Sequence, residues 1–148
     1  MDFEQLAFIE KWRRRAVRGV VVALDSTRGD VVLTLRAGDF GEALDLRGRD
    51  ETHAVRKQRL TLGDRIFVAF RYRISDVTPG SGAASPRTIG KGAEVEATLA
   101  EPGELAEMQI GGTKFLVDGD LAAFSAGDTV RFRVTDEGDA YIIPTRAG

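Results

Sequence analysis

The sequence has no cysteine and only one histidine among its 148 residues. The absence of cysteine excludes disulfide bonds, zinc–thiolate sites and thiol catalysis, and it fits a reducing compartment such as the cytoplasm. With His53 as the single histidine, the parts of a Ser-His-Asp triad or of a histidine metal site are missing. We therefore expect a non-catalytic protein with no metal and no cofactor, and we interpret His53 as a solvated surface side chain.

Long hydrophobic runs are absent as well. The longest apolar run, Val20 to Leu24, is far too short to cross a bilayer. The chain begins with acidic residues instead of a basic region before an apolar run, so no secretory signal is visible. We expect no membrane partner, and a composition of 43% hydrophobic and 30% charged residues is ordinary for a globular protein.

Charge is nearly balanced over the whole chain but not within it. The formal net charge is -2, yet residues 1–91 hold 17 Lys and Arg against 12 Asp and Glu, and residues 92–148 hold 4 against 11. This asymmetry is consistent with an anion-binding half beside an acidic half. It is equally consistent with charge complementarity between two modules or between copies of the chain.

The most informative stretch runs from Leu60 to Ile74. A turn containing Gly63-Asp64 leads into a strand in which every second residue is apolar, which is typical of a half-buried strand. The same motif, a Gly-Asp turn followed by an alternating strand, is repeated at residues 126–134. We interpret the chain as two related β-modules. The residues expected to point inward are Ile66, Val68, Phe70, Tyr72 and Ile74 in the first copy, and Val130, Phe132 and Val134 in the second.

The remaining segments fit around these two strands. Residues 2–15 predict an amphipathic helix with an apolar stripe and a basic last turn. The first module is expected over residues 16–77, with a hairpin, a strand ending at Leu46 and a polar loop from Arg47 to Arg59 that contains one helical turn. Residues 78–92 are rich in Gly, Ser and Pro, as in a flexible linker. The second module then occupies residues 93–148 and closes with a strand at residues 140–143.

The order of these elements resembles that of the OB-fold barrel. In particular, the segments Arg18–Val21, Gly29–Val32 and Leu62–Val68 resemble the S1 type of RNA-binding OB module. The resemblance implies a mainly β fold with two small antiparallel β-barrels behind an N-terminal α-helix, although the second barrel could equally be SH3-like. S1-like modules place stacking aromatic residues on their second and third strands, and the strand Val31–Leu35 has none.

Two binding functions follow from these patterns. The first is binding of single-stranded nucleic acid, RNA or DNA, with an exposed Phe67 stacking on a base and guanidinium groups contacting phosphates. The predicted site comprises Arg36, Arg47, Arg49, Arg56, Lys57, Arg59, Arg65, Phe67, Arg71 and Arg73.

The second function is protein–protein interaction or assembly of a homo-oligomer. Exposed apolar side chains on the strands, at Val32, Phe67 and Leu116, together with the N-terminal helix, would offer docking surfaces. The opposite charges of the two modules would allow copies of the chain to pack head to tail.

Overall fold

The computed structural model describes residues 15–38, 43–82, 87–103 and 105–143, and these are mainly β. The predicted N-terminal helix lies outside the described residues, apart from Arg15. The elements are β1 (Val17–Thr27), β2 (Asp30–Ala37), β3 (Leu44–Asp50), α2 (Ala54–Lys57), β4 (Arg65–Pro79), β5 (Thr88–Ile89), β6 (Glu94–Glu101), β7 (Ala106–Ile110), β8 (Thr113–Asp118), β9 (Thr129–Val134) and β10 (Asp139–Ile143).

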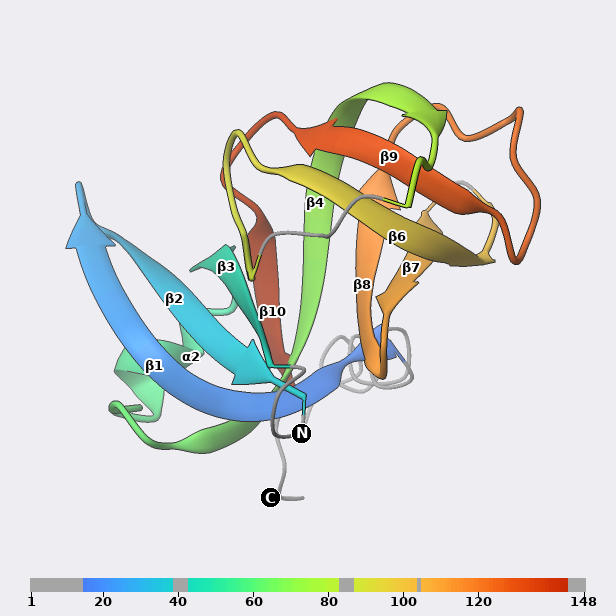
Figure 1. The fold of residues 1–148 in the computed structure, drawn as a ribbon. Coiled ribbons are helices and arrows are strands. Elements are labelled where there is room, and N and C mark those ends of the chain that lie inside the picture. The colour runs from blue at the N-terminus through green and yellow to red at the C-terminus, as the bar shows by residue number, and fades with distance from the viewer. Residues whose placement is uncertain (1–14, 39–42, 83–86, 104, 144–148) are drawn as a thin grey trace, which may run out of the picture.

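The long strand β4 is shared by two rings of hydrogen-bonded strands (Figure 1). In ring one, the order is β1-β2-β3-β10-β4, and the pairing of β4 with β1 closes it. In ring two, the order is β4-β8-β7-β6-β9, and the pairing of β9 with β4 closes it. The first half of β4 therefore belongs to ring one and the second half to ring two. Arg71 lies at the junction, in register with Asp139 of β10 on one side and with Leu116 of β8 on the other.

The two halves of the chain exchange their last strands. From the sequence, the strand near residues 140–143 is expected to close the second module, but β10 returns to ring one, antiparallel to β4 and parallel to β3. In exchange, the second half of β4 pairs in parallel with β8 and completes ring two. The hydrophobic alternation of β10 suits the interior of either ring, so local periodicity could not assign it.

The repeated Gly-Asp turn has the same geometry in both copies. Gly63 N–H donates to the Val21 carbonyl, and Gly127 N–H donates to the Leu99 carbonyl, each at 2.8 Å. Both glycines have a positive φ, 92° and 94°, which an L-residue adopts only with strain. The following aspartates, Asp64 and Asp128, each accept a backbone N–H three residues back at 2.8 Å. The internal repeat read from the sequence is confirmed at these two turns.

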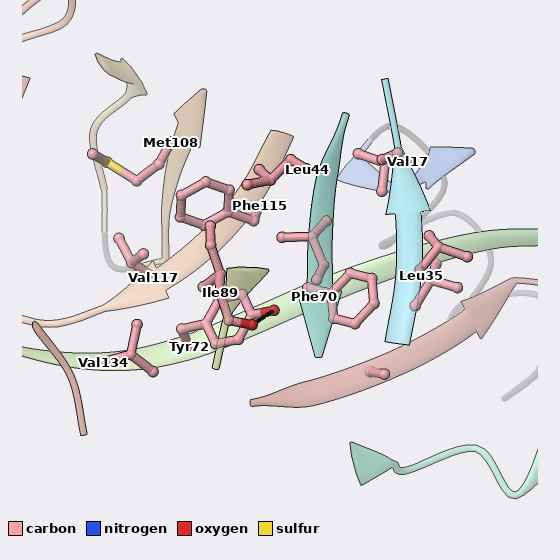
Figure 2. Packing of buried hydrophobic residues seen from close by; sticks show 14 of the residues in the cluster. Val17, Leu35, Leu44, Phe70, Tyr72, Ile89, Met108, Phe115, Val117 and Val134 are labelled. Atoms are coloured by element: carbon pink, nitrogen blue, oxygen red, sulfur yellow. Dashed lines mark hydrogen bonds between the residues drawn. The ribbon is translucent and has the colours of Figure 1, made fainter. Parts of the chain in front are cut away.

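The core is continuous through β4. All five residues predicted to face inward along β4 are buried. The Phe70 and Tyr72 rings stack with their centroids 6.2 Å apart, and Tyr72 meets Phe115 of ring two edge-on at 5.9 Å (Figure 2). The Tyr72 hydroxyl donates to the Arg47 carbonyl at 2.8 Å, which satisfies its polar atom inside the core. One apolar interior thus joins both rings.

Two segments differ from the predicted pattern. The polar loop expected from Arg47 begins later, because β3 continues to Asp50; the helical turn predicted within it is α2. Within the glycine-rich stretch, β5 pairs with β3, and Ile89 is fully buried. One apolar residue is enough to anchor a stretch whose composition is otherwise typical of a linker.

Candidate functional site

Two of the predicted site residues, Arg71 and Arg73, meet around one carboxylate. Asp139 on β10 lies in register with Arg49 on β3 and Arg71 on β4. Its carboxylate, almost fully buried, accepts from Arg71 Nη2 at 2.7 Å and lies 3.7 Å from Arg73 Nη2. These guanidinium groups are therefore neutralised by the chain itself.

The other arginines of β2 and β3 are also paired. Arg36 makes a two-pronged contact with Asp45, at 2.9 and 3.1 Å. This hydrogen bond and the aspartate charge raise the pKa of Arg36. Arg47 lies 3.5 Å from Glu137 and 3.8 Å from Asp25, and Arg49 lies 3.6 Å from Asp30. Each predicted phosphate contact on these strands already has an acidic partner.

The rest of the predicted site is dispersed. Arg56 and Lys57 lie on α2 and Arg59 just after it, all exposed, whereas Arg65 and Phe67 lie on β4 opposite β1. Phe67 is exposed as predicted, at 39%. The ten residues thus lie on β2, β3 and β4, on α2 and just after α2.

Two of the three apolar docking residues are not exposed. Val32 is 8% exposed and Leu116 is fully buried. Val32 lies in register between Asp25 and Arg49 on the neighbouring strands. Leu116 belongs to a second apolar cluster with Ala69 and Ile143. The prediction that Val32 and Leu116 are exposed was wrong because it treated the outward face of each strand as solvent-exposed; Leu116, for example, packs against Ala69 and Ile143 of ring one.

The environment of Glu51 gives a testable pH effect. Burial, and then the charge of Asp139, raise the pKa of the Glu51 carboxyl, while Arg49 opposes them. A raised pKa in the folded state means that stability is lost as pH rises from the unfolded value, about 4.3, through the folded one. We expect Glu51→Gln to raise the melting temperature at pH 7 by a small amount, because solvent screens this largely exposed group. Thermal melts of both proteins should converge below pH 4, and an equal difference at both pH values would contradict this explanation.

A pocket between the rings combines positive charge with backbone polar groups. It has a volume of about 330 Å³ and is lined by residues 16–18 at the start of β1, residues 37–38 at the end of β2, and residues 112–114 at the β7–β8 turn. Ring one and ring two both contribute to it. We call it the inter-ring pocket.

The inter-ring pocket has the electrostatics of an anion site. Arg18 of ring one and Lys114 of ring two are both among its lining residues. The lining residues that the structure describes include no carboxylate, and neither cation is in an ion pair with another described residue. Gly112 has open space where a side chain would stand, so a ligand can approach the backbone there. These two cations differ from Arg36, Arg47, Arg49, Arg71 and Arg73, each of which has an acidic partner within the chain.

No local sequence pattern indicates this pocket. Arg18 precedes a glycine at the start of a strand, and Lys114 follows the Gly111-Gly112 hairpin, which are common places for exposed cations. Only the contact between rings brings these two distant residues together. Sequence reasoning could have singled out Arg18 and Lys114 as unpaired cations only if the partners of the other arginines were already known.

Among the residues that the structure describes, no group of three or more His, Cys, Asp or Glu side chains is arranged to hold a metal ion. His53 is exposed and precedes α2 in a left-handed conformation, with φ 57°. No described helix has the length and hydrophobicity needed to span a membrane.

The fold and the pocket define a mainly β protein with a cationic pocket between two strand rings. Among solved structures, the chain is similar to the cytoplasmic molybdate-binding protein ModG, in a crystal form with molybdate bound. The TM-score is 0.52 at 16% sequence identity, over 88% of this chain and 96% of that one. At this identity the likeness concerns the fold. No protein-family model and no curated protein matches the sequence.

Proposed function

We propose that the protein is a non-catalytic binding protein that takes a small oxyanion in the inter-ring pocket. The observation that carries this proposal is the pair Arg18 and Lys114, which line one pocket from two different rings, with no carboxylate among its described lining residues. Charge-assisted hydrogen bonds from two cations and backbone N–H groups suit a compact dianion such as molybdate, tungstate or sulfate.

The likeness to ModG supports the same conclusion from the fold. That protein is described as binding molybdate. The strand order of each ring, with the first three strands antiparallel and the third parallel to the last, is that of an OB-like module. We accordingly propose two OB-like modules that exchange their closing strands, in a cytoplasmic protein.

Nucleic-acid binding receives less support from the geometry. Arg36, Arg47, Arg49, Arg71 and Arg73 each have an acidic partner within the chain. A phosphate backbone would have to compete with these ion pairs, so the electrostatic gain from counterion release would be small. A protein partner remains an alternative to be tested by light scattering.

The test is a calorimetric titration with molybdate, tungstate, sulfate and phosphate. We expect at least one of these anions to bind, and Arg18→Gln or Lys114→Gln to weaken binding about 10- to 100-fold, since a hydrogen bond to a charged group is worth about 1.5–3 kcal/mol. The matched control is Arg56→Gln on α2, which removes an exposed cation outside the pocket and should leave affinity unchanged. Equal affinity in all four proteins, or no oxyanion binding, would overturn the proposal.

A further inference from the structure

Because the strands of ring one and ring two pair in the same order, residues at equivalent positions along these strands can be matched. Strands β1 and β6 carry a bulge at the same place, between Val21 and Ala23 and between Leu99 and Glu101. This register makes Glu96 the counterpart of Arg18. The first residues of β3 and β8 pair with the ends of β2 and β7 in the same way. Asp45 is thereby the counterpart of Lys114.

The position equivalent to the inter-ring pocket is therefore inverted in charge. Both cations of the pocket are replaced by carboxylates, Glu96 for Arg18 and Asp45 for Lys114. The inversion extends to the neighbouring strands, where the register pair Arg49 and Asp139 in ring one corresponds to Asp118 and Arg73 in ring two. The two halves of the repeat thus differ systematically in sign.

The equivalent position is also occupied by the chain itself. Gly82 N–H donates to Glu96 Oε1 at 2.6 Å, and Asp45 N–H donates to the Arg87 carbonyl at 2.7 Å. Gly82 therefore lies against β6, and Arg87 against β3. Glu96 is almost fully buried, at 9% exposure. An anion entering there would meet the Glu96 carboxylate, would have to compete with Asp45 for Arg36, and would break these hydrogen bonds.

We propose that the two halves of the repeat provide only one anion site, so that each chain binds one oxyanion, in the inter-ring pocket. This inference rests on the proposed function. It adds the number of anions bound per chain and the structural reason for that number. At Glu96 and Asp45, anions are excluded by the Glu96 carboxylate and by the hydrogen bonds that Gly82 and Arg87 make there.

Stoichiometry measured in two ways tests this inference. Calorimetry and native mass spectrometry of the full chain, with molybdate and tungstate as probes, should give one anion per chain. The double variant Arg18→Gln Lys114→Gln should bind none. The matched controls at the equivalent position, Glu96→Gln and Asp45→Asn, should keep one anion per chain, and circular dichroism would confirm that every variant is folded.

The outcomes separate the two proposals. Two anions per chain, a value well below one that indicates a site shared between copies, or one anion still bound by the double variant would each overturn the single-site inference. With either of the first two outcomes, oxyanion binding in the inter-ring pocket itself would stand. An anion still bound by the double variant would also overturn the assignment of the inter-ring pocket as the site. Failure of the wild-type protein to bind any oxyanion would overturn the proposed function, and the single-site inference with it.

Discussion

Replacing Phe70 with alanine is expected to lower the free energy of unfolding by about 3–5 kcal/mol. Phe70 is fully buried and stacks on Tyr72, with the ring centroids 6.2 Å apart. A Cβ built on Gly48 would lie only 3.0 Å from Phe70 Cδ1, so the ring packs directly against the β3 backbone. Alanine would leave a cavity in the core that strand rings one and two share. Urea denaturation followed by circular dichroism would measure the loss of free energy of unfolding.

The matched control for this substitution is Leu62→Ala. Leu62 precedes the same strand but is 62% exposed, so its removal should change stability by no more than about 0.5 kcal/mol. A comparable loss in both variants would show that the interior at Phe70 is not tightly packed.

Separation of the two halves of the chain is expected to abolish folding of each. A fragment of residues 1–82 lacks β10, so β3 and β4 would lose a common neighbour and expose open edges. A fragment of residues 87–148 lacks β4, which ring two needs to close. We expect unfolded or aggregated fragments, and recovery of the native fold when both are expressed together.

Nuclear magnetic resonance spectra of each fragment and of the mixture would measure this. Dispersed amide signals from the isolated residues 1–82 would show that ring one does not depend on β10. That result would favour instead a division into independent modules near residues 78–92, as the sequence composition predicts.

The local architecture could be predicted from the sequence because period and turn chemistry are local properties. The alternation from Ile66 to Ile74 identified the buried face of β4, and the repeated Gly-Asp turn identified the internal duplication. The helical turn near Ala54 was also recovered. In each case neighbouring residues carried the information.

The pairing of distant elements could not be predicted in the same way. Nothing near Asp139 indicates that it would neutralise Arg71, which lies 68 positions away. Sequence reasoning could not tell which of the predicted site arginines would be paired with acidic residues, because exposed and paired arginines look alike in a sequence. Arg18 and Lys114 were not predicted as site residues because they are far apart in the sequence. Only the contact between ring one and ring two brings both to the inter-ring pocket.

The return of β10 to ring one also determines when the protein can fold during synthesis. Most modular chains can fold their N-terminal part while the ribosome is still making the rest. Here ring one needs β10, which follows every strand of ring two in the sequence. Ring one therefore cannot close until all strands of ring two have been synthesised, and the open edges of β3 and β4 must be kept from aggregating until then.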